Sequence, residues 1–181
     1  MTSIEDTEII ELFKLSKSKE KAFEILVKKY QEPLYWTIRR IVISHEDTDD
    51  VLQNTFIKIW KGLDKFKNQS KLFTWLYRIA VNEALTWINK NNKKIQYDSE
   101  INDNLINKLE ADVFFDGNEI EKKLQKSILS LPRRQQMVFN MKYYQHLKYD
   151  EIAKILDISI GSLKASYHLA VKKLEKYLLS D

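Results

Sequence analysis

Apolar residues recur every three or four positions over long stretches of this chain, which is the spacing that places side chains on one face of an α-helix. The segment from Lys71 to Lys93 is the clearest case, with an apolar stripe at Phe73, Leu76, Ala80, Ala84, Trp87 and Ile88. Few residues interrupt such patterns, because the 181-residue chain contains only three glycines and two prolines. Sheets with tight turns usually need more of both, so the sequence predicts an all-α protein.

Capping and breaking residues divide the apolar patterns into separate helices. Ser44, Ser70 and Ser159 are expected to cap the helices that come after them, and Pro33 is expected to kink or split a long helix. Pro132 suits the first position of a helix. The predicted helices cover about residues 4–15, 20–43, 45–63, 71–91, 119–129, 132–144, 149–156 and 160–179.

Charge is segregated along the chain. Residues 96–121 contain eight acidic residues and one basic residue, whereas residues 1–95 contain 17 basic and 13 acidic residues, and residues 122–181 contain 12 and five. Two basic segments on either side of an acidic strap favour a polyanionic partner. We expect two small helical domains, a bundle over residues 1–95 and a helix-turn-helix domain over residues 119–181, joined by an acidic flexible linker over residues 96–118.

Nothing in the sequence indicates an active site. The chain has no cysteine, and His45, His146 and His168 are scattered, so we predict no metal and no cofactor. No nucleophile is paired with a base, so we predict no catalytic residues. The N-terminus lacks the basic start and apolar run of a signal peptide, and no apolar stretch approaches the ~20 residues that span a bilayer. These absences predict a soluble cytoplasmic protein without membrane insertion.

The side of segment 71–93 opposite the apolar stripe combines an aromatic plane, cations and amides without a carboxylate. It holds Lys71, Trp75, Arg78, Asn82, Asn89 and Lys93. Such a row suits stacking on unpaired bases and attraction to their phosphates. The alternative is a core tryptophan beside ordinary solvated charges.

The segment from Tyr149 to Lys164 fits a helix-turn-helix, with Ile158 in the turn. In the last helix, Leu163, Tyr167, Ala170, Leu174 and Tyr177 form the expected buried stripe. Recognition helices use residues near their N-terminus on base edges and later cations on phosphates. We therefore assign Ser162, Lys164, Ala165 and His168 to the major groove, and Lys172 and Lys173 to the DNA backbone. The alternative is a helical hairpin without a DNA role.

A third row, on the helix after Ser44, is polar except at its end. It comprises Asp49, Asp50, Gln53, Asn54 and Ile57. Such a row is most often a solvated face, but an exposed Ile57 beside acidic residues also suits docking of a basic partner helix.

These blocks together resemble a bacterial RNA polymerase sigma factor of the extracytoplasmic-function group, which has sigma-70 regions 2 and 4 only. Residues 49–60 resemble region 2.2, and residues 73–82 resemble region 2.3 and the positions directly after it. Residues 131–135 and the helix-turn-helix resemble region 4. The match covers about residues 20–95 and 119–178, in the order and spacing of the family.

The resemblance implies three sets of contacts. Core RNA polymerase would bind through its β′ clamp helices to Asp50, Gln53, Asn54 and Ile57, and its β flap would be a further point of contact. The melted −10 strand of promoter DNA would lie on Phe66, Asn68, Ser70, Lys71, Trp75, Tyr77, Arg78 and Asn82. The −35 duplex would meet Ser162, Lys164, Ala165, His168, Lys172 and Lys173. The family also leads us to expect an anti-sigma factor as a partner.

The function implied is transcription initiation: binding core polymerase, directing it to promoters and promoting their melting. Two rivals stay open on the residues alone. A polymerase-independent helix-turn-helix regulator would explain the C-terminal segment but not the cationic, aromatic row at residues 71–93. A helical adaptor that binds only proteins would show no salt-sensitive binding to nucleic acid.

Overall fold

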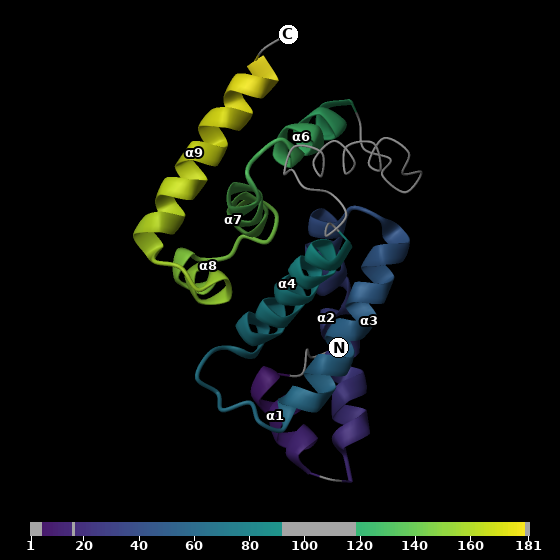
Figure 1. Ribbon diagram of the computed structural model, residues 1–181. Coiled ribbons are helices and arrows are strands. Elements are labelled where there is room, and N and C mark those ends of the chain that lie inside the picture. The colour runs from purple at the N-terminus through teal and green to yellow at the C-terminus, as the bar shows by residue number, and fades with distance from the viewer. Residues whose placement is uncertain (1–4, 16, 92–118, 180–181) are drawn as a thin grey trace.

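The computed structural model describes residues 5–15, 17–91 and 119–179, and every regular element within these ranges is an α-helix (Figure 1). The all-α prediction is therefore confirmed. The N-terminal module, residues 5–91, contains α1 (Asp6–Lys14), α2 (Lys19–Val42), α3 (His45–Leu63) and α4 (Leu72–Asn91). The C-terminal module, residues 119–179, contains α6 (Glu119–Leu129), α7 (Arg133–Tyr143), α8 (Tyr149–Leu156) and α9 (Ile160–Leu179). The predicted acidic linker lies outside the described residues.

Helix α2 is the centre of the N-terminal module, because it packs against α1, α3 and α4. Its side chains Leu26, Leu34 and Ile38 are completely buried, and each contributes about 1.5–3 kcal/mol to folding. Pro33 does not split this helix: α2 runs through it without a break, so the expected split is wrong. Buried residues on both sides of Pro33, among them Tyr30 and Leu34, pack into the core and stabilise a continuous helix despite the missing backbone donor.

Aromatic rings of α1, α2 and α3 pack against one another within the bundle. Phe13 and Phe23 each meet the ring of Trp60 edge-on, with centroids 5.3 and 4.9 Å apart, and Phe23 meets Phe56 in the same way. Edge-to-face pairs of this kind add about 0.5–1.5 kcal/mol beyond the burial of their area. They hold α1 against α2 and α3.

The C-terminal module is built around α9, which packs on α6, α7 and α8. Asp157, in the left-handed region at φ 54°, ends α8 and turns the chain into α9. The predicted cap at Ser159 is confirmed, since its Oγ accepts the Ser162 amide N–H at 3.2 Å. Ser44 accepts the Asp47 amide N–H and caps α3 as expected. Tyr177 is 41 % exposed, so its predicted place in the buried stripe of α9 is wrong.

The two modules touch. Helix α8 packs against α4, and α7 packs against α2, so that the C-terminal module lies beside the upper part of the bundle (Figure 1). Val138, Met141 and Ile152 of the C-terminal module belong to the same buried cluster as Leu34 and Ile38 of α2. No helix in the described ranges is long and apolar enough to cross a membrane.

Candidate nucleic-acid and polymerase interfaces

The polar row of α4 is presented outward because the opposite side of the helix is buried. Leu76, Ala80 and Ala84 are completely inaccessible, and α4 packs on both α2 and α3. This burial leaves Lys71, Arg78 and Asn82 exposed along one side. The structure thus brings together two cations and an amide where the sequence predicted them.

The tryptophan of this row, Trp75, is partly exposed and partly packed against the core. The Trp75 ring lies 5.2 Å from the Phe66 ring, and Phe66 is itself only 7 % exposed although it sits in the connection between α3 and α4. A Cβ atom at Gly62 would lie 3.1 Å from the Trp75 indole, so the glycine permits this close approach. Trp75 is therefore a half-buried wall rather than a freely projecting ring.

A cavity of about 460 Å³ opens against that wall, which is within the size range of small-ligand sites. Its lining combines two aromatic rings with four cationic side chains and one carboxylate. Asn68, in the left-handed region at φ 54°, turns the chain beside it and is exposed. The lining comes from the connection (Lys65, Phe66, Lys67, Gln69, Ser70), from α4 (Thr74, Trp75, Arg78) and from α8 (Lys154, Asp157).

Two expectations about this region are wrong. Tyr77 does not share the outer row with Arg78, because it is 7 % exposed and its ring meets Phe73 edge-on at 6.1 Å. Burial raises the pKa of Tyr77. The helical spacing from Phe73 to Tyr77, one turn apart, was the signal that places both on one face. Ser70 does not cap α4, since its hydroxyl donates to the Lys71 carbonyl at 3.3 Å.

The face of α9 predicted to read duplex DNA is open. Lys164, Ala165, His168, Lys172 and Lys173 are all exposed. Ser162 is partly covered, because Arg134 of α7 donates a 2.5 Å hydrogen bond from Nη2 to its Oγ. Sequence reasoning missed Arg134 as a neighbour of this face, because the two residues are 28 positions apart.

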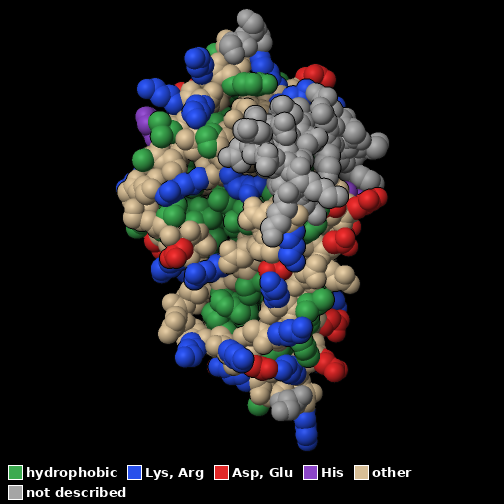
Figure 2. All heavy atoms as spheres, in the orientation of Figure 1, with side chains coloured by type: hydrophobic (Ala, Val, Ile, Leu, Met, Phe, Trp, Pro, Cys, Tyr) green, Lys and Arg blue, Asp and Glu red, His purple; other side chains and the backbone are tan. Residues whose placement is uncertain are grey.

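The third row lies on α3, where Asp50, Gln53, Asn54 and Ile57 are all exposed along one side. Ile57 is 45 % exposed, and it adds apolar surface to this otherwise polar row. Figure 2 shows several acidic side chains along the right-hand edge, over α3, whereas Lys and Arg side chains spread over the face of both modules. The acidic and apolar α3 row is thus separate from the cationic α4 row.

Two family models match the chain, one in each module. The family model of sigma-70 region 2 matches residues 26–94, and that of sigma-70 region 4 matches residues 121–174. The ECF RNA polymerase sigma-E factor of Escherichia coli is 30 % identical over 167 residues, which cover 84 % of each chain. The RNA polymerase sigma-H factor of Pseudomonas aeruginosa is 26 % identical over 98 % of this chain and 96 % of its own.

Solved structures share the fold. CnrH, solved in complex with the cytosolic domain of CnrY, superposes with a TM-score of 0.69 at 21 % identity, over 97 % of this chain and 99 % of its own. The sigma factor RpoE of Bartonella quintana, solved with the anti-sigma factor NepR, gives the same TM-score at 20 % identity, over 89 % and 99 %. With its outward rows on α3, α4 and α9, this chain belongs to the extracytoplasmic-function group of sigma-70 factors, carries regions 2 and 4, and is a transcription initiation factor.

Proposed function

We propose that the chain carries core RNA polymerase to promoters by three surfaces with separate tasks. The exposed face of α9 binds the −35 element as duplex. The α4 row and the connection before it hold the −10 element as a single strand, and the α3 row docks on the β′ clamp helices. The single observation that supports this best is the cationic row of α4 beside a cavity with an aromatic wall.

Melting results from selective binding. Phosphates are attracted to Lys71 and Arg78, Asn82 can pair with a base edge, and an unpaired base can stack in the cavity against Trp75. Stacking contributes ~1–3 kcal/mol per base, which offsets part of the cost of unpairing. Because this surface binds only the separated strand, binding shifts the duplex towards the open form. No covalent chemistry is required, and we propose that the chain has no catalytic activity.

The two DNA contacts act together because both are tethered to one polymerase. Each is small, but a second contact made within one complex depends on effective concentration rather than on another encounter. The site of action is the cytoplasm, where polymerase and promoter DNA are found. An anti-sigma factor is the proposed regulator, since RpoE, which shares the fold, was solved with the anti-sigma factor NepR.

The proposal is tested by run-off transcription with purified core polymerase and a promoter library. We expect transcripts that depend on added protein and on a subset of templates. Sequence-specific duplex binding without any transcript would instead identify a polymerase-independent regulator.

Docking through α3 has its own test, in which Asp50→Ala is combined with Gln53→Ala. We expect weaker binding to core polymerase, by about tenfold if one charge-assisted contact is lost. A matched control is Gln31→Ala with Glu32→Ala, which likewise removes one amide and one carboxylate, from an exposed part of α2. Equal affinity of the two double variants in a titration would reject the assignment.

A further inference from the structure

The hydroxyl group of Ser162 is bonded differently from other hydroxyl groups on the helices of this protein. Thr55, Thr86 and Ser166 each donate their proton to the carbonyl oxygen four positions earlier, at 2.8, 2.7 and 2.9 Å. Ser162 lies in the first turn of α9, so the carbonyl four positions earlier comes before the helix. Its Oγ instead accepts a hydrogen bond from Arg134 Nη2 at 2.5 Å, and no acceptor in the described ranges takes its proton. The Ser162 hydroxyl can therefore donate to a group outside the chain.

Arg134 reaches Ser162 from the beginning of α7. It is the second residue of that helix, and it is exposed. Helix α7 packs along α9, and the stacked rings of Phe139 and Tyr167, with centroids 6.0 Å apart, join the two helices. This packing holds the backbone of Arg134 at a set place beside the first turn of α9.

A guanidinium group beside a hydroxyl group changes what the hydroxyl binds. A serine hydroxyl has one proton to donate and two lone pairs that accept. Arg134 occupies one lone pair of Ser162, and its positive charge polarises the O–H bond, which makes the proton a better donor. The same charge repels an incoming amino group, whose hydrogens are partly positive. Ser162 is thereby biased towards partners that accept a hydrogen bond.

Bases differ in this respect along the major groove. Guanine presents only the acceptors N7 and O6, and thymine presents the acceptor O4, whereas cytosine presents only an amino group. A serine without a charged neighbour can bond to either kind of base. The charge beside Ser162 therefore favours some bases over others.

We propose that Arg134 is a positioning residue for −35 recognition, which holds the Ser162 hydroxyl as a hydrogen-bond donor and so selects guanine or thymine over cytosine at one position of the −35 element. The inference deepens the proposed function of α9 and rests on it. Arg134 acts through Ser162 and not by a base contact of its own.

The test uses the holoenzyme, formed from core polymerase and the full chain, and duplex promoters with a randomised −35 element. Bound promoters are separated and sequenced, and the ratio of guanine and thymine to cytosine is determined at each position. The variants are Arg134→Ala, Ser162→Ala and the two combined. All of them keep the amide N–H at position 162, which Ser159 Oγ accepts.

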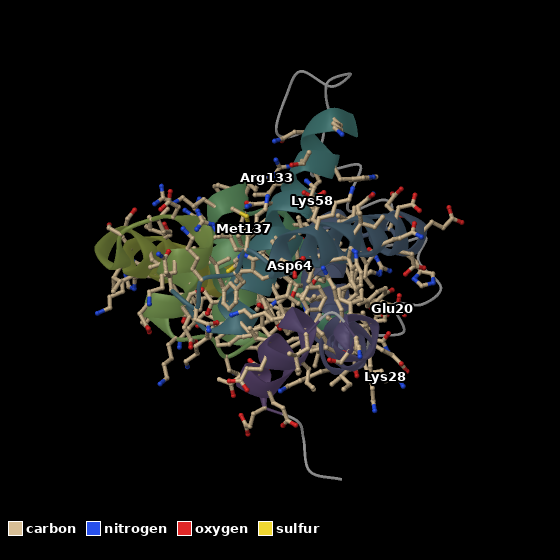
Figure 3. All side chains as sticks on the ribbon, turned by 90° about the horizontal axis from the view of Figure 1, so that it is seen from below. Glu20, Lys28, Lys58, Asp64, Arg133 and Met137 are labelled. Atoms are coloured by element: carbon tan, nitrogen blue, oxygen red, sulfur yellow. The ribbon has the colours of Figure 1, made fainter. Side chains whose placement is uncertain are left out.

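Arg133→Ala is the matched control, because it removes the same charge from the neighbouring position of α7. Arg133 lies beside α4 (Figure 3), where its Nη1 donates to Asn89 Oδ1 at 3.1 Å. Its loss should leave the base preferences at the −35 element unchanged.

We expect Arg134→Ala and Ser162→Ala to lower the preference at the same single position by about fivefold, which is the effect of about one hydrogen bond. The combined variant should lose no more than Ser162→Ala alone, because both substitutions remove one shared contact.

Three results would overturn the inference. Uniformly weaker binding of all promoters by Arg134→Ala would identify Arg134 as a phosphate contact. A changed preference at a position that Ser162→Ala leaves intact would identify a base contact of Arg134 itself. An equal effect of Arg133→Ala would show that any cation of α7 serves.

The outcomes also separate this inference from the function on which it rests. If the unaltered holoenzyme selects a −35 sequence and Arg134→Ala selects the same sequence equally strongly, α9 reads the duplex and the role of Arg134 is wrong. If the unaltered holoenzyme selects no −35 sequence, both proposals are wrong.

Discussion

The surfaces of α9 and α4 that we propose to bind DNA differ in how many of their side chains also pack within the protein. On α9, Ala165 and His168 project into solvent, Lys164 Nζ lies 5.7 Å from the centre of the Tyr149 ring, and Ser162 accepts a hydrogen bond from Arg134. On α4, Trp75 packs on Phe66 and Gly62, and Lys71 pairs with a buried glutamate. A duplex-reading face can be built from a helix whose other side is packed. A pocket for a single strand must be lined by several side chains, and some of these side chains also pack in the hydrophobic core.

The largest effect that would sharpen this comparison is on promoter melting. Arg78→Ala with Asn82→Ala should lower open-complex formation about a hundredfold or more, because two hydrogen bonds to the DNA are lost and each charge-assisted one contributes ~1.5–3 kcal/mol. Binding to core polymerase should be unchanged. Permanganate reactivity of the −10 thymines measures the effect, and Lys28→Ala, an exposed residue of α2, is the control. A footprint equal to that of the unaltered chain would contradict the assignment.

The next largest difference should be in the free energy of unfolding, which a substitution on α4 should lower more than one on α9. Trp75→Ala removes a half-buried ring that Phe66 and Gly62 contact, and should lower the free energy of unfolding by ~2–3 kcal/mol, below the full cost of an entirely buried tryptophan. His168→Ala on the exposed face of α9 should change it by less than ~0.5 kcal/mol. Urea denaturation measures both. Similar losses in the two variants would show that both surfaces contribute equally to the stability of the fold.

Alkaline pH tests the buried side of α4. Burial raises the pKa of Tyr77, so the folded state favours the neutral phenol. This contribution is fully present below the unfolded pKa of about 10 and is lost as the pH rises through the folded value. We therefore expect stability to fall above about pH 10, and Tyr77→Phe to fall less steeply. Denaturation series at pH 8 and at higher pH compare the slopes, and parallel curves would speak against a buried Tyr77.

The smallest effect concerns the start of α9. Ser159→Ala removes the side-chain acceptor for the Ser162 amide and should cost ~1 kcal/mol of stability. Ser159→Asn, which keeps an acceptor, should restore most of it. Thermal unfolding monitored by circular dichroism provides the measurement. If alanine and asparagine behave alike, the cap does not contribute to the helix-turn-helix.

Helix positions were largely predictable from the sequence, and residues at helix ends show why. The helix at Tyr149–Leu156 was predicted with its observed bounds, and the cap at Ser159 was predicted with its partner helix, because both depend on neighbours within a few positions. Ser70 looked like a cap equally well, yet its hydroxyl turns to the Lys71 carbonyl. The residue type shows which side chains can cap a helix. The backbone conformation at each position determines which of them do so.

The candidate sites were predictable in part. Exposure of Asp50, Gln53, Asn54 and Ile57 is a consequence of helical spacing. The burial of Phe66 beneath Trp75 is not, because it depends on how the connection between α3 and α4 folds back. Tyr77 was placed outward by resemblance to a family, although its spacing from Phe73 pointed inward.

The helical fold class, the ends of most helices and the polar helix faces can be predicted from the amino-acid sequence, because these properties arise from interactions over one or two turns. The continuation of α2 through Pro33 and the contact of Glu151 with Lys71 depend instead on tertiary packing. Residues 80 positions apart meet only when buried apolar surfaces join. That joining depends on shape and area over the whole molecule, and no local pattern of residues specifies it.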